Sequence, residues 1–263
     1  MTHVRIGAVG YLNARPLTWA LDRDPGRWRV RYDVPSVCSA LLHRGEVDLG
    51  LIPSVEYLQS SDYRFVPGIG VCSRGAVASV ALYTRRPIED VRHVALDSSS
   101  RTSVALIQIL CRHRFRITPS FVPHGPDLAA MTVACDAALL IGDPAFDAPH
   151  EALGLRKIDL GEEWTAMTGL PFVYAAWTGR PGAADKGVVS ALQRAQVDGL
   201  AATDAIASEY GRGDAARAAR AAAYLRDNVK YELGADEASG LQLFLDYAAD
   251  LGVAPRRRTV EFF

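Results

Sequence analysis

Short apolar runs separated by turn residues dominate the first part of the chain. Residues 4–9 form one such run and residues 47–52 form another. Residues 29–34 lie between them and alternate between apolar and polar, as a half-buried strand does. Pro16 and Ser36 stand where helices can begin. The resulting order of strand, helix, strand, helix and strand predicts an α/β sheet with mainly parallel strands.

The same order of elements returns further along the chain. Residues 94–96 form a short apolar run, and a helix is expected over about 104–112. Another buried strand is expected at residues 137–141. Residues 47–54 and 135–144 also share a weak pattern, in which an Asp precedes an apolar strand and a turn that starts a helix. These parallels predict two lobes of like architecture.

Two further strands, at residues 79–83 and 172–177, are candidates for crossovers between the lobes. We expect the rest of the chain to be helical and to pack back onto the first lobe. The expected helices cover residues 186–209, 215–228 and 236–250. We therefore predict an α/β fold with a ligand cleft between two lobes. Lobe one comprises residues 1–84 and 179–263, and lobe two comprises residues 85–178.

Composition and charge describe an ordinary globular chain. Of its 263 residues, 49% are hydrophobic and 22% are charged, and the formal net charge is −1. This balance gives no reason to expect nucleic acid or an anionic membrane as a partner. No stretch approaches the roughly 20 apolar residues of a membrane-spanning helix, and the first residues lack the pattern of a signal peptide. We expect a cytoplasmic protein whose oligomeric state the sequence leaves open.

Motifs for metal, phosphate and nucleophile chemistry are missing. The four cysteines show no CxxC pairing and no histidine at zinc-ligand spacing, so we predict buried free thiols and no metal site. The cysteines are Cys38, Cys72, Cys111 and Cys135. The sequence contains no P-loop, dinucleotide fingerprint, GxSxG elbow or HExxH motif. The candidate loops are instead rich in hydroxyl and amide groups.

Four polar loops follow predicted strands and precede predicted helices. In open α/β sheets, ligands bind beyond the carboxyl ends of the strands. A helix that begins there offers free N–H groups and a partial positive charge, which suit a carboxylate or a phosphate. The loops with this placement are residues 10–13, 35–36, 98–103 and 142–143.

Individual side chains in these loops each allow two interpretations. Residues 98–103 carry five hydroxyls and Arg101 around one helix start, which suits an anion held by neutral donors. Alternatively, one hydroxyl caps the helix and the others face solvent. Asn13 can donate and accept hydrogen bonds in the cleft without a charge, or can serve as a helix cap or Asx-turn residue. Asp143 can act as a general acid or base, or as a cap.

Five stretches of the chain, taken in order, resemble the motifs of one enzyme family. They are residues 10–17, 47–57, 99–103, 141–143 and 159–173, apart from residues 165–167. Together they resemble the chorismate dehydratase family of the futalosine route to menaquinone. A sibling enzyme of that route opens with Pro-Cys-Pro-Asn, whereas this chain has Tyr-Leu-Asn, which favours the dehydratase. The helical C-terminal part resembles the family only in general character.

The resemblance implies the periplasmic-binding-protein type II fold and a reaction without a cofactor. Chorismate would lose water to give 3-[(1-carboxyvinyl)oxy]benzoate, and the substrate's own carboxylate is thought to remove the C3 proton. The protein would position the substrate and stabilise the transition state. The cleft Asn and Ser of the family match Asn13 and Ser79, which we predict to be catalytic. The predicted substrate-binding residues are Tyr11, Ser36, Ser99, Arg101, Thr102, Ser103, Gly142 and Asp143.

Two other functions fit the same fold, because a fold does not determine a function. One alternative is a cytosolic binding protein for a small carboxylate. The other is the sibling enzyme, which acts on a cyclised futalosine-type nucleoside. Incubation with chorismate distinguishes these functions from dehydration.

Overall fold

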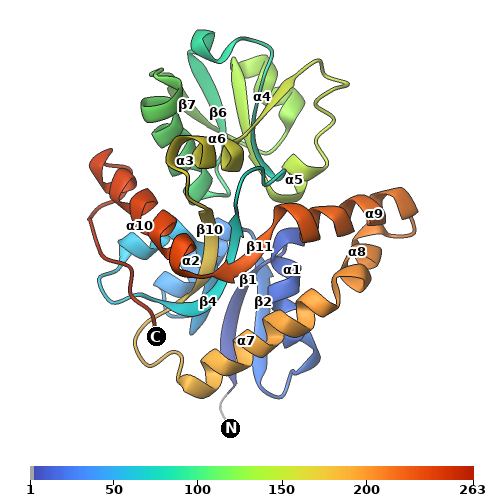
Figure 1. Cartoon of the computed structure of the whole chain (residues 1–263), viewed down its shortest axis with the longest axis vertical. Helices are drawn as coiled ribbons and strands as arrows, with labels where there is room; N and C mark the ends of the chain where they lie inside the picture. The colour runs from blue at the N-terminus through green and yellow to red at the C-terminus, as the bar shows by residue number, and fades with distance from the viewer. Residues whose placement is uncertain (1–2) are drawn as a thin grey trace.

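The computed structural model describes residues 3–263 and contains two mixed β-sheets, which lie one above the other in Figure 1. We call the part built on the first sheet lobe one and the part built on the second sheet lobe two. The first sheet has the order β11 (Lys230–Leu233), β4 (Arg64–Ser73), β10 (Phe172–Gly179), β3 (Leu49–Pro53), β1 (Val4–Val9) and β2 (Trp28–Asp33). The second has the order β7 (Ser120–His124), β6 (His93–Asp97), β8 (Ala137–Ile141), β5 (Val80–Thr84) and β9 (Arg156–Asp159).

The two sheets share one pattern of strand pairing. In lobe one, β1 pairs in parallel with β2 and β3, and in lobe two, β6 pairs in parallel with β7 and β8. Next to each parallel triplet lies an antiparallel strand, β10 beside β3 and β5 beside β8. The predicted α/β fold with two similar lobes is therefore confirmed. The expectation of mainly parallel strands is wrong outside the triplets, because each sheet also accepts a strand that arrives from the opposite lobe.

The chain changes lobes immediately before β5 and β10, not within them. β5 pairs only with strands of the second sheet, and β10 pairs only with strands of the first. A strand needs partners along its whole length to satisfy its backbone groups, so each of these strands belongs to one lobe. We therefore propose boundaries within residues 74–79 and 169–171, in place of 84 and 178.

Helices flank both sheets and form most of the C-terminal region. The α-helices are α1 (Arg15–Thr18), α2 (Pro35–His43), α3 (Arg101–Leu110), α4 (Leu128–Ala134), α5 (Gly142–Phe146), α6 (Leu160–Thr168), α7 (Lys186–Ala201), α8 (Thr203–Gly211), α9 (Ala215–Ala223) and α10 (Ala235–Asp250). Short 3₁₀ turns are η1 (Leu12–Ala14), η2 (Leu21–Arg23), η3 (Ser54–Gln59) and η4 (Ile88–Asp90), and π turns are η5 (Cys111–Phe115) and η6 (Tyr224–Asn228). Side chains that accept a backbone N–H cap several helix starts. These are Ser100, Asp127, Asp159, Asp185 and Asp214.

The sequence pattern predicted a C-terminal region that is helical throughout. The structure shows that it is not. Its third helix, α9, ends at Ala223 and continues as the π turn η6. The strand β11 then pairs with β4 at the edge of the first sheet. In β11, Tyr231 and Leu233 are buried, whereas Lys230 and Glu232 are exposed. This alternation marks a strand, but four residues are too few to stand out beside long helices.

The hydrophobic core is continuous between the lobes. One cluster of buried side chains includes Leu51 and Phe172 from lobe one and Leu82 and Leu106 from lobe two. A smaller cluster around Tyr83 lies within lobe two. Because apolar contacts run from one lobe to the other, the lobes are packed together in this structure.

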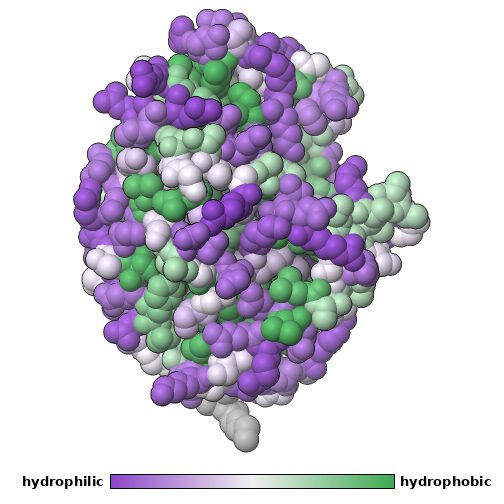
Figure 2. Space-filling model, viewed as in Figure 1, coloured by the Kyte–Doolittle hydropathy of each residue, from purple (hydrophilic) through white to green (hydrophobic). Residues whose placement is uncertain are grey.

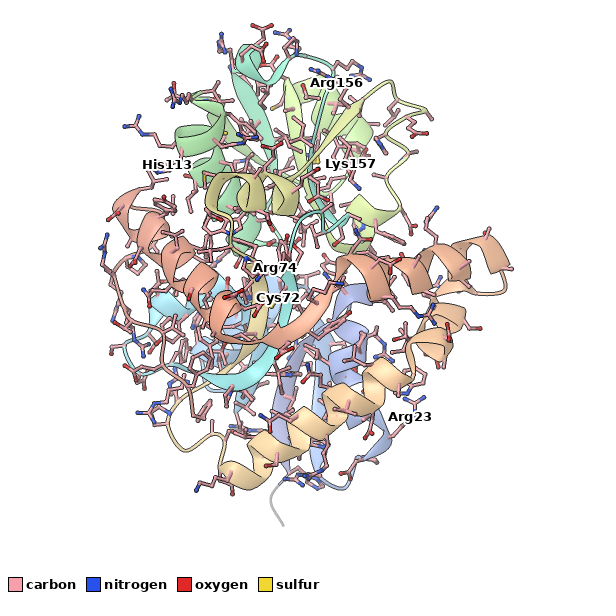
Figure 3. The ribbon with its side chains drawn as sticks, in the orientation of Figure 1. Arg23, Cys72, Arg74, His113, Arg156 and Lys157 are labelled. Atoms are coloured by element: carbon pink, nitrogen blue, oxygen red, sulfur yellow. The ribbon has the colours of Figure 1, made fainter. Side chains whose placement is uncertain are left out.

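Hydrophilic side chains cover most of the face shown in Figure 2, apart from scattered apolar patches such as the alanine-rich helix α9 on its right. None of the helices within residues 3–263 combines the length and the apolar character needed to cross a membrane. The four cysteines are free. Cys38, Cys72 and Cys111 are buried as predicted, and Figure 3 places Cys72 within lobe one, whereas Cys135 is partly exposed.

Candidate active site

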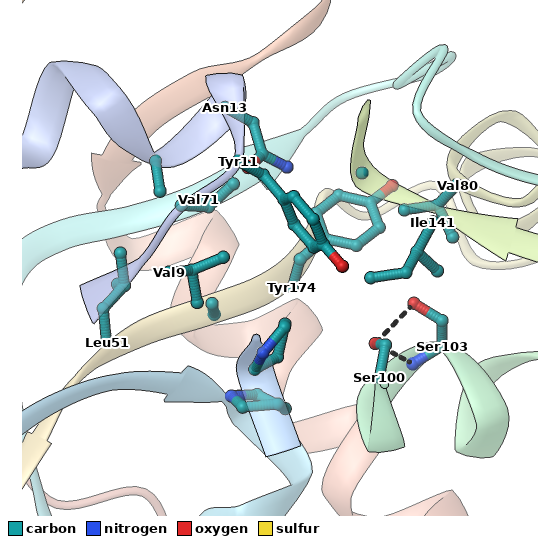
Figure 4. A pocket seen from close by; sticks show the side chains of 15 residues that line it. Val9, Tyr11, Asn13, Leu51, Val71, Val80, Ser100, Ser103, Ile141 and Tyr174 are labelled. Carbon is teal, nitrogen blue, oxygen red and sulfur yellow. Dashed lines mark hydrogen bonds between the residues drawn. The ribbon is translucent and has the colours of Figure 1, made fainter. Parts of the chain in front are cut away.

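A cavity lies between the lobes, beyond the ends of β1, β3 and β8. All four polar loops singled out in the sequence contribute to it. Its lining consists of Val9, Tyr11, Asn13, Ala14, Pro35, Leu51, Pro53, Val71, Val80, Ser100, Ser103, Ile141, Gly142, Tyr174 and Ala175. In Figure 4, Tyr11 and Asn13 extend into the cavity from lobe one, and Ser100 and Ser103 face it from lobe two.

The wall of this cavity carries no charged side chain among the residues that line it. Its polar groups are the amide of Asn13 and the hydroxyls of two serines and two tyrosines. Such groups bind a ligand through hydrogen bonds but do not form an acid–base pair. Within residues 3–263, no three His, Cys, Asp or Glu side chains come together as a metal site would require.

The start of α3 forms the polar wall of the cavity in lobe two. Ser100 caps the helix: its Oγ accepts the Ser103 N–H at 3.3 Å and donates to Ser103 Oγ at 3.0 Å. The hydroxyl hydrogen of Ser103 is thereby left free to be donated into the cavity. No acidic residue lies in the first turn of this ten-residue helix, so no side chain of that turn neutralises its partial positive charge. This wall therefore suits a carboxylate.

Four of the residues predicted to bind substrate connect the lobes and do not themselves line the cavity: Ser36, Ser99, Arg101 and Thr102. The Ser36 N–H donates to the Ser99 carbonyl at 3.1 Å. Thr102 is 1% exposed, and its hydroxyl accepts the Val55 N–H at 3.2 Å. Their contact with substrate remains a prediction. Their observed bonds join loops of lobe one to the segment that positions α3.

A buried carboxylate extends this junction between the lobes. The Glu56 side chain is 1% exposed, and its two oxygens contact Arg101 at 3.0 Å and the His43 ring at 2.6 Å. The other ring nitrogen of His43 lies 2.7 Å from the Tyr63 hydroxyl. Both oxygens of Glu56 are therefore partnered, which a buried carboxylate requires. Through Arg101, this chain of contacts holds the first turn of α3 against lobe one.

Tyr11 and Asp143 close the opposite side of the cleft. The Asp143 carboxylate, from α5 of lobe two, accepts the Leu12 N–H of lobe one at 2.9 Å. Burial raises the pKa of Asp143 to about 6, against the opposing effect of this bond, and nearby Asp147 adds to the increase. Burial also raises the pKa of Tyr11, with Asp97 and Asp143 acting in the same direction. The hydroxyl of Tyr11 is therefore protonated at neutral pH.

Ser79 lies behind the cavity wall, in the segment where the chain crosses between lobes. It is fully buried, and its carbonyl accepts the Gly142 N–H at 2.8 Å. Its Oγ accepts a hydrogen bond of 2.7 Å from the hydroxyl of Tyr224. The Asn13 amide lies close enough to the same hydroxyl to lower its pKa. The two residues that the resemblance marks as catalytic thus both lie next to one tyrosine of the C-terminal region.

The backbone just before Ser79 is held in an unusual conformation. Ala78 has φ +65°, in the left-handed region that alanine rarely adopts. The Asp159 carboxylate accepts the N–H of Val77 at 3.0 Å and that of Ala78 at 2.6 Å, and the Lys157 ammonium, labelled in Figure 3, donates to the Ala78 carbonyl. Asp159 thus has a structural role: it fixes the crossover that carries Ser79.

A comparison of the sequence with protein families assigns the chain. The sequence model of a family described by the words menaquinone biosynthesis matches residues 4–250. The chain belongs to this family. The match includes the C-terminal helices, which the motifs alone did not cover.

One relative, the chorismate dehydratase of Thermus thermophilus, is 32% identical over 268 residues, covering 95% of this chain and 96% of the relative. Solved structures with less than 20% identity share the fold. One is a protein of Archaeoglobus fulgidus, with a TM-score of 0.75 over 95% of this chain and 98% of that chain, at 19% identity. Another is the periplasmic aliphatic sulphonate binding protein of Escherichia coli, with a TM-score of 0.68 over 98% and 90%, at 18% identity. The predicted periplasmic-binding-protein-like fold is confirmed.

Sequence reasoning missed two tyrosines of this family member's site. Tyr174 lines the cavity from β10, and its hydroxyl lies 2.9 Å from Ser73 Oγ. Its place in a predicted crossover strand could have indicated it. Tyr224 follows an alanine-rich helix without any motif, so no pattern in the sequence pointed to it.

Proposed function

We propose that the chain is a chorismate dehydratase, which converts chorismate to 3-[(1-carboxyvinyl)oxy]benzoate and water in menaquinone biosynthesis. The observation that carries the proposal is the uncharged cavity, in which an amide and several hydroxyls face the start of α3. A cavity of this kind can hold a substrate with two carboxylates. Because no charged side chain lines it, removal of the proton is left to the substrate. The Thermus relative bears the name of this activity.

The reaction balances without an oxidant or a reductant. A carboxylate of the substrate removes the C3 proton, the C4–O bond breaks, and the ring becomes aromatic. The departing hydroxide takes up one proton and leaves as water, which regenerates the carboxylate. Because aromatic stabilisation drives this step, the protein contributes mainly by orientation and by hydrogen bonds to the departing group.

Asn13 and Ser79 are the residues proposed to act at the reacting atoms. Asn13 lines the cavity and would hold the departing hydroxyl or the enolpyruvyl carboxylate. Ser79 would assist by hydrogen bonding after a small movement of the wall formed by Val80 and Gly142. Ser103, at the free start of α3, would bind a substrate carboxylate.

Incubation of the purified protein with chorismate, followed by proton NMR, tests this function. We expect loss of the diene signals and appearance of an aromatic product. Heat-denatured protein serves as the control for spontaneous decay. Binding without conversion would favour a small-carboxylate receptor. The absence of both binding and conversion would rule out the assignment. The cytoplasmic location and the lack of nucleic-acid or membrane partners remain predictions.

A further inference from the structure

We infer that Tyr224 is a positioning residue that orients both Asn13 and Ser79 for the reaction. The inference rests on the proposed function and deepens it. It assigns the C-terminal region a role in the reaction in addition to its packing against the two lobes.

Tyr224 connects three distant parts of the chain. It begins the π turn η6 and is 3% exposed. Its hydroxyl donates to Ser79 Oγ at 2.7 Å, and the Asn13 amide lies close enough to lower the pKa of this hydroxyl. Its ring lies against Phe146 of lobe two, with 4.6 Å between the ring centroids. Tyr224 therefore contacts Ser79 and the opposite lobe, and lies next to Asn13.

The direction of the hydrogen bonds gives Tyr224 its effect. A phenol has one hydrogen to donate. Because Tyr224 gives this hydrogen to Ser79, its oxygen is left as an acceptor, which we infer takes an N–H of Asn13. The amide of Asn13 is then fixed, with its carbonyl oxygen and second N–H free for the cleft. The hydroxyl hydrogen of Ser79 is likewise free to be donated to the departing group.

Burial keeps this arrangement in one protonation state. It raises the pKa of Tyr224 well above its ordinary value, and the neighbouring Ser79 and Asn13 oppose the shift without cancelling it. The phenol therefore stays neutral and acts as an orienting group. It does not line the cavity, so contact with the substrate is not part of its role.

The test is Tyr224→Phe, which removes the hydroxyl and keeps the ring against Phe146. We expect kcat for chorismate to fall about 10- to 100-fold, with KM within about threefold of the parent, because misplacement of catalytic groups affects the transition state more than binding. The matched control is Tyr231→Phe. The Tyr231 hydroxyl is also buried but has no hydrogen-bonding partner among the described residues. This control should keep the parent kcat.

A second arm separates positioning from a general loss of packing. In a Ser79→Ala background, Tyr224→Phe should lower kcat several-fold less than in the parent, because part of its effect passes through Ser79. An equal loss in both backgrounds, or a kcat within twofold of the parent in the single variant, would overturn the inference and leave the proposed function intact. A parent protein that does not convert chorismate would overturn both.

Discussion

Tyr11 and Gly142 contact each other across the cleft so closely that residue 142 has no room for a side chain. A Cβ placed on Gly142 would lie 2.5 Å from Cδ2 of the Tyr11 ring. Gly142 also has φ +60°, a conformation that favours glycine. The contact joins the loop after β1 to the start of α5, and both residues line the cavity. The shape of the closed cleft therefore depends on this glycine.

Replacement of this glycine should impair catalysis more than it impairs folding. Gly142→Ala would displace the Tyr11 ring, and we expect kcat/KM for chorismate to fall at least about tenfold. The matched control is Gly154→Ala, since Gly154 has φ +64° and no atom within 4 Å of an added Cβ. Both variants should lose about 1 kcal/mol of stability to backbone strain. Equal activity of the two in steady-state assays would contradict a role for the contact.

The amide of Asn13 should matter for turnover more than for stability. Removal of one preorganised hydrogen-bonding group from a cleft of this kind costs about 100-fold in kcat or more, so we expect a loss of that order for Asn13→Ala. The control is Asn228→Ala, because the Asn228 amide donates to Ala76 away from the cavity. Initial rates of aromatic product formation measure both variants. Unchanged turnover in Asn13→Ala would exclude the proposed role.

The position of the cavity could be predicted from the sequence, because the order of strands and helices brings certain loops together at the edge of a sheet. Asn13, Ser103 and Gly142 each come after the end of a strand, and the structure places all three in the lining of the cavity. Such short-range patterns depend on hydrophobic periodicity and helix starts, which a single sequence displays.

Side-chain direction and long-range pairing could not be predicted. Thr102 and Ser103 are neighbours on one helix, yet they point about 100° apart, so one meets Val55 and the other lines the cavity. Tyr224 reaches Ser79 over 145 positions of sequence. That pairing depends on where η6 and β11 place the chain, and neither element has a distinctive pattern.

The two hydroxyls of Thr102 and Ser103 should therefore respond differently to removal. Thr102→Val leaves the buried Val55 N–H without an acceptor, and we expect a loss of about 1–3 kcal/mol in the free energy of unfolding with KM little changed. Ser103→Ala should raise KM at nearly parental stability. Urea unfolding and steady-state kinetics report the two effects. An increased KM in Thr102→Val at unchanged stability would instead support contact between Thr102 and substrate.

The raised pKa of Asp143 should make the protein less stable as pH rises from about 4 to about 6. The native pKa of about 6 exceeds that of an unfolded Asp, near 3.9, so the native state binds more protons in this window. Asp143→Asn keeps an oxygen for the Leu12 N–H but carries no charge. We expect it to stabilise the protein at pH 7 by about 1–2 kcal/mol, allowing for partial exposure, and to have little effect at pH 4.

Urea unfolding of Asp143→Asn across this pH range measures the effect, and an opposite case provides the control. The pKa of Asp136 is lowered, because backbone N–H groups of Arg92 and His93 and the charge of Arg86 outweigh its burial. Asp136→Asn should therefore destabilise the protein at pH 7. A pH-independent difference between Asp143→Asn and the parent would contradict the buried-charge explanation.

Closure of the lobes should depend on salt through Asp147. At the end of α5 in lobe two, its carboxylate accepts from the Tyr210 hydroxyl at 2.8 Å and pairs with Arg217 at 2.7 Å and with Arg220. These partners lie on α8 and α9 of lobe one, so the cluster links the lobes outside the cavity. Its members are partly exposed, and together such pairs contribute on the order of 1 kcal/mol.

Loss of this link should favour the open form and so weaken substrate binding without altering the chemistry. We expect Asp147→Asn to raise KM about two- to fivefold at an unchanged kcat. An increase in salt from about 0.05 M to about 0.5 M should raise the KM of the parent more than that of the variant. The variant already lacks the Asp147 charge, so it has fewer ion pairs between the lobes that salt can screen. The control is Asp204→Asn, because Asp204 pairs with Arg226 within lobe one. An equal salt response in the parent and Asp147→Asn would show that these charges do not govern closure.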